Sequence, residues 1–329
     1  MGQQHFQIYQ GMENVELVAV CDVIPERASE KAPSVGGNIG EASELDLSAQ
    51  ARYMCFSEML EKEKLDLVDI CTPTHVHAQM TVEALQAGNN VVCEKPMART
   101  VAQCDEMIAA AEKSGKMLFI AQCIRFWPEY EVLARMVGNG DLGQVKAARF
   151  IRQSATPGWA SEGWLMNPEL SGGALLDLHI HDVDFILSLL GKPNAVFARG
   201  MNLLTEGAPV DHVETQYLYS DFVCTAHGGW VYPDSFPFNM AFQVLGTRGV
   251  LEFSVGNDPV LRWYPFEGEP TTPEYEGGTG YQNELAYFVQ CVEDGTPPRR
   301  VTPQSARESV RVVEAEAASI ESREIVTIG

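Results

Sequence analysis

The sequence predicts an α/β protein in which a doubly wound parallel sheet is followed by an α+β domain with a large, mostly antiparallel open sheet. Three observations support this. The chain has 329 residues, more than one typical core needs, which favours two domains. Over residues 1–121, short apolar runs alternate with helix-length segments, as in β-α-β units. Over 122–329, runs of alternating apolar and polar residues indicate antiparallel strands.

The first domain is expected to be Rossmann-like, with buried parallel strands that end in polar turns. A polar, glycine-containing stretch over 33–50 is expected to be a surface loop. The expected strands are Val15–Cys21, Leu65–Cys71, Asn89–Cys93 and Met117–Ala121, and the expected helices are Gln3–Gln10, 76–87 and 101–114, the last capped by Thr100.

The second domain is expected to carry its antiparallel strands over 144–154 and 193–266. A single helix is predicted over 173–190, because its apolar residues follow helical spacing along one face. Two more helices are predicted over 280–294 and 303–319, the second beginning at Pro303. We expect this last helix to pack back on the first domain.

Composition narrows the class of protein. The formal charge of −22 argues against a nucleic-acid partner, because phosphate binding relies on clustered Lys and Arg. No apolar run of about 18 residues predicts a membrane span, and no signal peptide is visible. The eight cysteines are scattered without a Cys-x-x-Cys pair, which favours reduced thiols in the cytoplasm over a disulfide framework or a metal site.

Asp22 follows the first predicted strand, where an acidic side chain can accept hydrogen bonds from an adenosine ribose. A 2′-phosphate would be repelled there, so NAD is favoured. Arg27 softens that preference and leaves NADP as the alternative cofactor. A helix-capping role is the alternative reading of Asp22 itself.

The glycine pattern before the first helix is incomplete. A dinucleotide-binding unit begins with a strand and G-x-G-x-x-G, whereas here Gly2 stands alone as the counterpart of the third glycine. The missing strand would be central in the sheet, so its loss would leave two rows of backbone groups unpaired. We expect the natural protein to extend upstream of Met1; the alternative is a chain that folds with a weakened nucleotide site.

Two further turns follow buried strands at the edge where α/β sheets bind ligands. Thr72-Pro73 with His77 can contact a ribose or pyrophosphate, although turn formation alone also explains Thr-Pro. Glu94-Lys95-Pro96 places a lysine where it can hydrogen-bond a substrate hydroxyl as hydride leaves. An ordinary surface lysine is the alternative.

Asp177 and His181 are four residues apart on the predicted 173–190 helix and would share a face. A carboxylate beside an imidazole orients it and raises its basicity, which suits a general base. A histidine without a catalytic role is the alternative. His179 and His181 lie roughly 200° apart around a helix, so they cannot chelate one metal ion.

Together these residues resemble the Gfo/Idh/MocA family of NAD(P)-dependent oxidoreductases over nearly the whole chain, apart from the missing strand and first two glycines. The resemblance implies that Lys95 and His181 are the catalytic pair, with Asp177 in the substrate site. It also implies that Glu94 contacts the nicotinamide end and Arg125 the cofactor or substrate. Candidate aromatic residues for stacking on a substrate ring are Trp127, Tyr130, Trp159 and Trp164, for each of which core packing is the alternative.

The expected activity is hydride transfer between NAD(H) and a secondary hydroxyl of a sugar, a cyclic polyol or a derivative, the substrate class that the resemblance implies. One alternative is a lyase, hydrolase or dehydratase that oxidises its sugar transiently and shows no net change in NADH. Another is a non-catalytic nucleotide-binding sensor, which the joint presence of Lys95, Asp177 and His181 argues against. A homodimer or homotetramer is expected, because the open sheet needs its exposed face covered.

Overall fold

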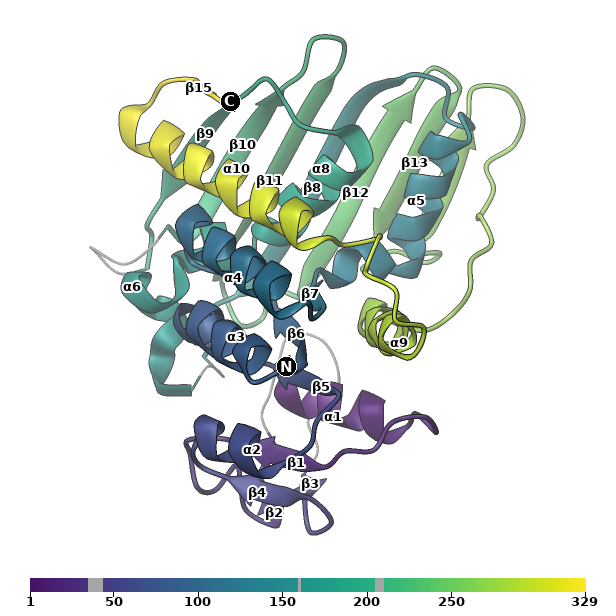
Figure 1. Ribbon diagram of the computed structural model, residues 1–329. Helices are drawn as coiled ribbons and strands as arrows, with labels where there is room; N and C mark the ends of the chain where they lie inside the picture. The colour runs from purple at the N-terminus through teal and green to yellow at the C-terminus, as the bar shows by residue number, and fades with distance from the viewer. Residues whose placement is uncertain (35–43, 159–160, 205–209) are drawn as a thin grey trace.

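The computed structural model describes residues 1–34, 44–158, 161–204 and 210–329. The predicted class is confirmed: parallel strands with helices form the N-terminal part, and an eight-stranded, mostly antiparallel sheet forms the C-terminal part (Figure 1). The predicted loop over 33–50 lies largely outside the described residues, since 35–43 are among those not described.

The N-terminal part contains two separate parallel sheets and a short antiparallel pair. Strand β1 (Ala19–Cys21) pairs with β4 (Ala51–Tyr53), while the second sheet has the order β5-β6-β7. The remaining elements are α1 (Gly2–Gln10), β2 (Lys31–Ala32), β3 (Leu45–Asp46), α2 (Phe56–Lys62), β5 (Leu67–Ile70), the 3-10 turn η1 (Thr74–Val76), α3 (His77–Gln86), β6 (Asn90–Glu94), α4 (Val101–Ser114) and β7 (Leu118–Ala121).

In the described part of the chain, no strand joins β1 to β5, so each has a sheet neighbour on one side only. Strand β1 is shorter than the predicted Val15–Cys21. Residues 15–18 have no neighbouring strand on the side facing away from β4, and the hydrogen bonds to such a strand would extend β1. Helix α1 bridges the two sheets. His5 contacts the β5 side chain Asp69, and Phe6 packs in the small apolar cluster beside β1.

The C-terminal part is built on a sheet of order β14-β13-β12-β8-β11-β10-β9-β15, in which only β8 and β11 pair in parallel. Its strands are β8 (Val145–Ala155), β9 (Ala195–Met201), β10 (His212–Leu218), β11 (Val223–Tyr232), β12 (Asn239–Gly246), β13 (Gly249–Ser254), β14 (Leu261–Pro265) and β15 (Val326–Thr327). Its helical elements are η2 (Cys123–Phe126), α5 (Pro128–Gly138), η3 (Ser161–Met166), α6 (Pro168–Ser171), α7 (Gly173–Asp177), α8 (Ile180–Leu190), α9 (Gly280–Glu293) and α10 (Pro303–Ser322).

The core under this sheet is aromatic and lies on the face covered by α5 and α8. Tyr130 is fully buried there against Phe185, Phe242 and Phe253, with ring centroids 4.8–5.5 Å apart. Such edge-on contacts add to the free energy gained by burying the rings. Tyr130, one of the aromatic residues considered for stacking on a substrate, is therefore a core residue.

Helix α10 lies along the large sheet and beside α4 of the N-terminal part (Figure 1). The helix begins at Pro303, as predicted, and the side chain of the preceding Thr302 caps it by accepting a hydrogen bond from Ser305 N. Arg307 forms an ion pair with Asp105 of α4, and Ser319 Oγ accepts a hydrogen bond from Ala198 N of β9. The helix thus fastens the N-terminal part to the large sheet.

Two expectations from composition can be compared with this structure. All eight cysteines are free. Among the described residues, no helix is both long enough and apolar enough to cross a membrane.

Candidate active site

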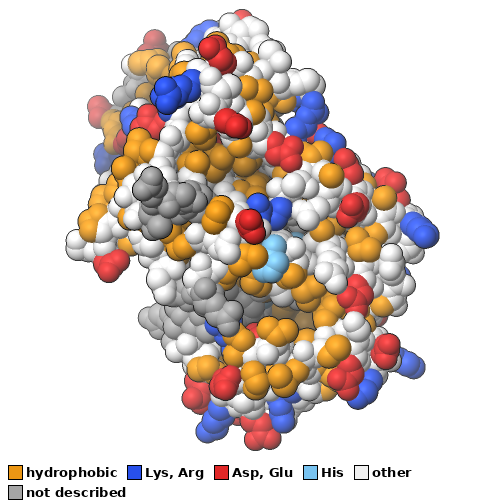
Figure 2. Space-filling model, turned by 90° about the vertical axis from the view of Figure 1, so that its left-hand side faces the viewer, with side chains coloured by type: hydrophobic (Ala, Val, Ile, Leu, Met, Phe, Trp, Pro, Cys, Tyr) orange, Lys and Arg blue, Asp and Glu red, His pale blue; other side chains and the backbone are white. Residues whose placement is uncertain are grey.

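A cleft of about 1490 Å³ lies between the two parallel sheets and the segment of α7 and α8. Figure 2 shows a hollow in one face of the molecule where basic, acidic and histidine side chains adjoin hydrophobic ones. Most of the predicted site residues line the cleft: Gly2, Asp22, Thr72, Pro73, Glu94, Lys95, Trp164, Asp177 and His181.

Lys95 lies directly after β6, where the carboxyl end of a parallel strand opens into the cleft. Its Nζ donates hydrogen bonds to the backbone oxygen of Asp177 at 2.7 Å and to Asp177 Oδ1 at 3.2 Å. Only 13% of the Lys95 side chain and 18% of the Asp177 side chain are exposed, so this ion pair is poorly screened by solvent. The pair brings a cation from the N-terminal part to a carboxylate of the C-terminal part.

The predicted single helix over 173–190 is wrong, because the structure has α7 and α8 with a break at residues 178–179. At the break, His179 N donates to Ala174 O, five residues earlier, and the α-helical spacing is lost. Asp177 therefore ends α7, and its carboxylate turns to Lys95. No hydrogen bond joins Asp177 to His181 in the described part of the chain, contrary to the expected i, i+4 contact.

His181 lies in the first turn of α8, and its Nδ1 is buried without a protein partner. Burial, together with the positive charges of Lys95 and Arg152, lowers the pKa of His181 well below the usual value of 6.5. The expectation that Asp177 raises the basicity of this ring is therefore wrong. The imidazole is neutral near pH 7 and can accept a proton.

Sequence reasoning missed Arg152, which also lines the cleft. Its guanidinium is held by Asp182 through hydrogen bonds of 3.0 and 2.9 Å, and both side chains are buried. The sequence of β8 could have indicated that Arg152 is buried, because it stands in an alternating series with the apolar residues Ala148 and Phe150, which occupy buried positions of the strand. A charged residue in such a series needs a buried counter-ion.

Glu94 ends β6 and is only 5% exposed. Its Oε2 accepts a hydrogen bond from Lys95 N at 2.9 Å, and its Oε1 lies 3.2 Å from His5 Nε2. Burial alone would raise the pKa of Glu94, but His5 and Lys95 lower it below its usual range. Glu94 is thus a fixed carboxylate at the floor of the cleft.

The residues predicted for the nucleotide fit a bound dinucleotide in part. A Cβ added at Gly2 would lie 3.4 Å from Cys71 Cβ, so α1 approaches the end of β5 closely, which is the role of the third glycine. Thr72 Oγ1 is buried without a protein hydrogen-bond partner. Asp22 lies at the end of β1, where its Oδ1 caps the turn by accepting from Ile24 N at 2.8 Å.

Two predicted cofactor ligands do not line the cleft. His77 is 1% exposed, and its ring nitrogens lie 2.8 Å from Pro96 O and Thr72 O. It therefore ties the Thr72 turn to the turn after Lys95.

Arg125 forms a two-pronged ion pair with buried Asp184, at 2.6 and 2.7 Å. Because its guanidinium binds a carboxylate of α8, the structure gives Arg125 a stabilising role, not the expected contact with cofactor or substrate.

Among the candidate aromatic residues, Trp164 and Trp127 line the cleft. Trp127 packs edge-on against Tyr281 with ring centroids 5.7 Å apart. Trp159 lies outside the described residues.

A cleft at the carboxyl ends of parallel strands that is lined by an acid, a lysine and a neutral histidine is typical of a nucleotide-dependent oxidoreductase. Comparison with known families gives the same class. Residues 1–122 match the model of an oxidoreductase family with an NAD-binding Rossmann fold, and residues 130–252 match the GFO/IDH/MocA C-terminal domain. The chain belongs to the Gfo/Idh/MocA family, and its first domain is an NAD-binding Rossmann domain.

Curated relatives of this chain include sugar and polyol dehydrogenases. D-glucoside 3-dehydrogenase of Escherichia coli is 39% identical over 192 residues, which span 57% of this chain and 50% of that protein. The chain thus matches about half the length of that relative. Myo-inositol 2-dehydrogenase of Thermotoga maritima is 24% identical over 91% of this chain and 87% of its own.

Solved structures share the fold. The WlbA dehydrogenase from Bordetella pertussis, in complex with NADH and UDP-GlcNAcA, has a TM-score of 0.82 at 20% identity, with 100% of this chain and 95% of that chain covered. The aldose-aldose oxidoreductase from Caulobacter crescentus, complexed with glycerol, has a TM-score of 0.83 at 24% identity, with 99% and 96% covered.

Proposed function

We propose that this protein is an NAD-dependent dehydrogenase that transfers hydride between NAD(H) and a secondary hydroxyl of a sugar, a cyclic polyol or a derivative. The main support for the proposal is that Lys95, Asp177 and His181 line the same cleft as the turn of Thr72 and Pro73, which is proposed to bind the nucleotide. The activities named for the relatives support the substrate class.

The three side chains have complementary roles. The Lys95 ammonium, 3.2 Å from the Asp177 carboxylate, donates a hydrogen bond to the substrate oxygen and stabilises negative charge on it. The neutral imidazole of His181 accepts the hydroxyl proton. Asp177 orients Lys95 and accepts a hydrogen bond from a neighbouring substrate hydroxyl.

NAD would be held by Asp22 at its ribose, by Thr72 and Pro73 along the backbone, by the start of α1 near Gly2, and by Glu94 beside the nicotinamide. When bound, it supplies the hydride acceptor for the oxidation direction. The Asp22 carboxylate favours NAD over NADP because it repels a 2′-phosphate. Replacing Asp22 with alanine should therefore narrow the difference in affinity between NADH and NADPH in a calorimetric titration.

The test of the activity is reduction of NAD in the presence of a panel of sugars and cyclic polyols, with the Lys95→Met variant in parallel. Loss of a positioned proton donor predicts a fall in kcat of about 10²- to 10⁴-fold. Lys113→Met, on the exposed side of α4, is the matched control and should retain the wild-type rate. Equal rates for Lys95→Met and wild type would refute the assignment.

Transient oxidation of a sugar, followed by its reduction, is a second candidate reaction and needs a separate assay. One relative, 2,7-anhydro-N-acetylneuraminate hydratase of Mediterraneibacter gnavus, is 26% identical over 63% of this chain and 51% of its own. An enzyme that oxidises its sugar and reduces it again shows no net NADH. Analysis of products by mass spectrometry and NMR separates this case, since the sugar would change while the absorbance of NADH stays constant.

We also propose that the protein works in the cytoplasm as a homo-oligomer, a dimer or tetramer, in which a second copy covers the outer face of the large sheet. The free cysteines fit a reducing compartment. Val223 of β11, Met201 of β9 and Tyr264 of β14 are large apolar residues of the sheet that are 54%, 46% and 38% exposed. Light scattering should give a mass above that of one chain, and Val223→Glu should lower it; a monomeric wild type would contradict the proposal.

A further inference from the structure

A buried network of three polar side chains lies at the break between α7 and α8. His179 Nε2 is 3.4 Å from Glu316 Oε1 of α10 and 3.2 Å from the hydroxyl oxygen of Tyr217 of β10. His179 and Glu316 are fully buried, and Tyr217 is 1% exposed. The cleft is lined by other residues, so the catalytic roles proposed above do not involve these three.

The hydrogen bonds of this network are incomplete. His179 Nδ1 and Glu316 Oε2 are buried without a hydrogen-bond partner in the described part of the chain. Burial raises the pKa of Tyr217 well above its usual value, and the carboxylate of Glu316 raises it further, so the hydroxyl keeps its proton and can donate it. Buried polar groups with missing partners destabilise a fold relative to apolar side chains of similar size. Stability of the core therefore does not account for three polar residues at this place.

The backbone at the break supplies an atom that the candidate active site uses. His179 N donates to Ala174 O at 2.8 Å, five residues earlier, and the α-helical spacing ends there. In an unbroken helix, the backbone oxygen of Asp177 would accept a hydrogen bond from His181 N. In this structure it accepts from Lys95 Nζ at 2.7 Å. The break thus provides the lysine with an oxygen that a regular helix would not offer.

His179 stands in the middle of the segment that the active site depends on. It comes two residues after Asp177 and two residues before His181. The two partners of its ring belong to regular elements, Glu316 to α10 and Tyr217 to β10. A ring held from two elements limits the movement of the backbone on either side of it. Such a limit matters because a shift of about 1 Å at the reacting groups can cost about 100-fold in rate.

We propose that His179, held by Glu316 and Tyr217, is a positioning residue of the active site. It fixes the break between α7 and α8, and with it the two positions that carry Asp177 and His181. This inference rests on the proposed dehydrogenase function, because the network acts through residues that are proposed to carry the reaction. Sequence spacing did not predict the network, since the two partners stand 38 and 137 residues from the histidine.

The first test compares two variants of buried residues in α10. Glu316→Leu removes one partner of His179 without leaving a buried charge. With a sugar that the wild type oxidises, its kcat should fall about 10- to 100-fold. Its affinity for NADH should match wild type, because the residues proposed to hold the nucleotide lie on other elements. Ser319→Ala is the matched control, since Ser319 bonds to Ala198 and Glu324 instead, and it should keep the wild-type kcat.

Milder variants separate positioning from a general loss of stability. Glu316→Gln keeps an acceptor oxygen for its two partners and should retain more of the wild-type kcat than Glu316→Leu. Circular dichroism checks that each variant is folded. If Glu316→Leu does not fold, Tyr217→Phe, which removes only a hydroxyl, takes its place. A wild-type kcat in the folded test variant, an equal fall in Ser319→Ala, or equal falls in Glu316→Gln and Glu316→Leu would overturn the proposal.

An NMR titration of His181 tests the same proposal without cofactor or substrate, so its outcome is independent of the dehydrogenase activity. A loosened break should admit water to this buried ring, and its pKa should rise toward 6.5 in Glu316→Leu or Tyr217→Phe. The pKa should stay at the wild-type value in Ser319→Ala. A His181 titration that is the same in all these proteins would overturn the positioning role, whereas a wild type that oxidises no sugar would contradict the dehydrogenase proposal instead.

Discussion

Replacing Arg125 with methionine distinguishes a stabilising role from a role in binding. In the structure, Arg125 donates two charged hydrogen bonds to Asp184, whose side chain is only 1% exposed. After the replacement, the Asp184 carboxylate would keep the hydroxyl of Ser309, at 2.8 Å, as its remaining side-chain donor. Removing one member of a buried ion pair costs about 3–5 kcal/mol. We therefore expect the free energy of unfolding to fall by about 4 kcal/mol, a large share of the roughly 5–15 kcal/mol typical of folded proteins.

Urea unfolding followed by circular dichroism measures this loss, and the double variant Arg125→Met/Asp184→Leu provides the control. Because it contains no buried unpaired charge, the double variant should recover most of the stability. In the folded fraction, the affinity for NADH should match wild type. A loss of stability below about 1 kcal/mol, together with a clear loss of NADH affinity, would refute the stabilising role and show that Arg125 contributes to cofactor binding.

Two further predictions concern the active site and the packing of α9. The imidazole of His181 should titrate below pH 6.5 in an NMR experiment, so that its neutral form persists as the pH falls through 6.5. Replacing Lys95 with methionine removes a nearby cation and should raise the pKa of His181. An unchanged titration in this variant would contradict the proposed effect of the Lys95 charge. Gly280→Ala should destabilise the fold by about 1–3 kcal/mol in chemical unfolding, because the new Cβ would lie 2.4 Å from the backbone oxygen of Cys123. Gly277→Ala, whose Cβ would have no neighbour within 4 Å, is the control, and equal losses for both would show that this contact is not responsible.

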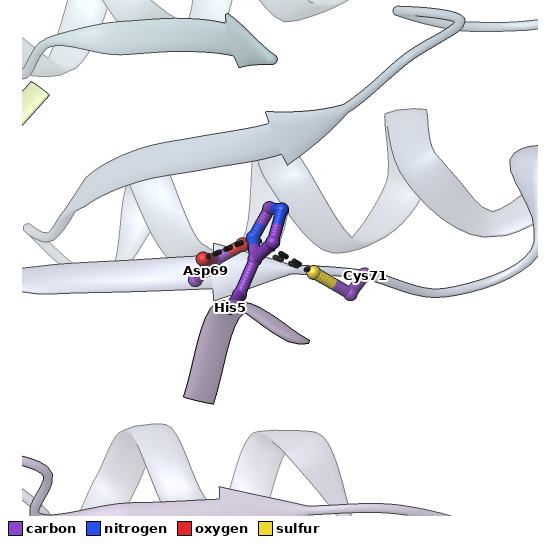
Figure 3. A group of neighbouring side chains, drawn as sticks. All are labelled: His5, Asp69 and Cys71. Atoms are coloured by element: carbon purple, nitrogen blue, oxygen red, sulfur yellow. Dashed lines mark hydrogen bonds and ion pairs between the residues drawn. The ribbon is translucent and has the colours of Figure 1, made fainter. Parts of the chain in front are cut away.

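The separation of the parallel strands into two sheets has a direct consequence for the cleft. Asp22 and Arg27 line it from the β1 side, and Thr72 and Lys95 line it from the other sheet. Helix α1 contacts the β5 side through His5 (Figure 3) and the β1 side through Phe6.

Local sequence signals determined much of this protein. Apolar runs that end in polar turns located β5, β6 and β7, and Thr100 and Pro303 marked the starts of α4 and α10. These predictions succeeded because strand burial and helix capping depend on residues close together in the chain. The same signals located Lys95 and Asp22, since both directly follow strands.

Tertiary structure decided the contacts of the charged groups. The break before α8 directs Asp177 to Lys95, a partner 82 residues away, while Arg125 and Arg152 find their carboxylates on α8. Sequence spacing could not show this, because a buried charge selects whichever counter-ion the fold brings within hydrogen-bond distance. The sequence alone thus determined most of the elements and the candidate chemical groups. Which of those groups face the cleft, and which stabilise the protein from within, was decided only when distant segments packed together.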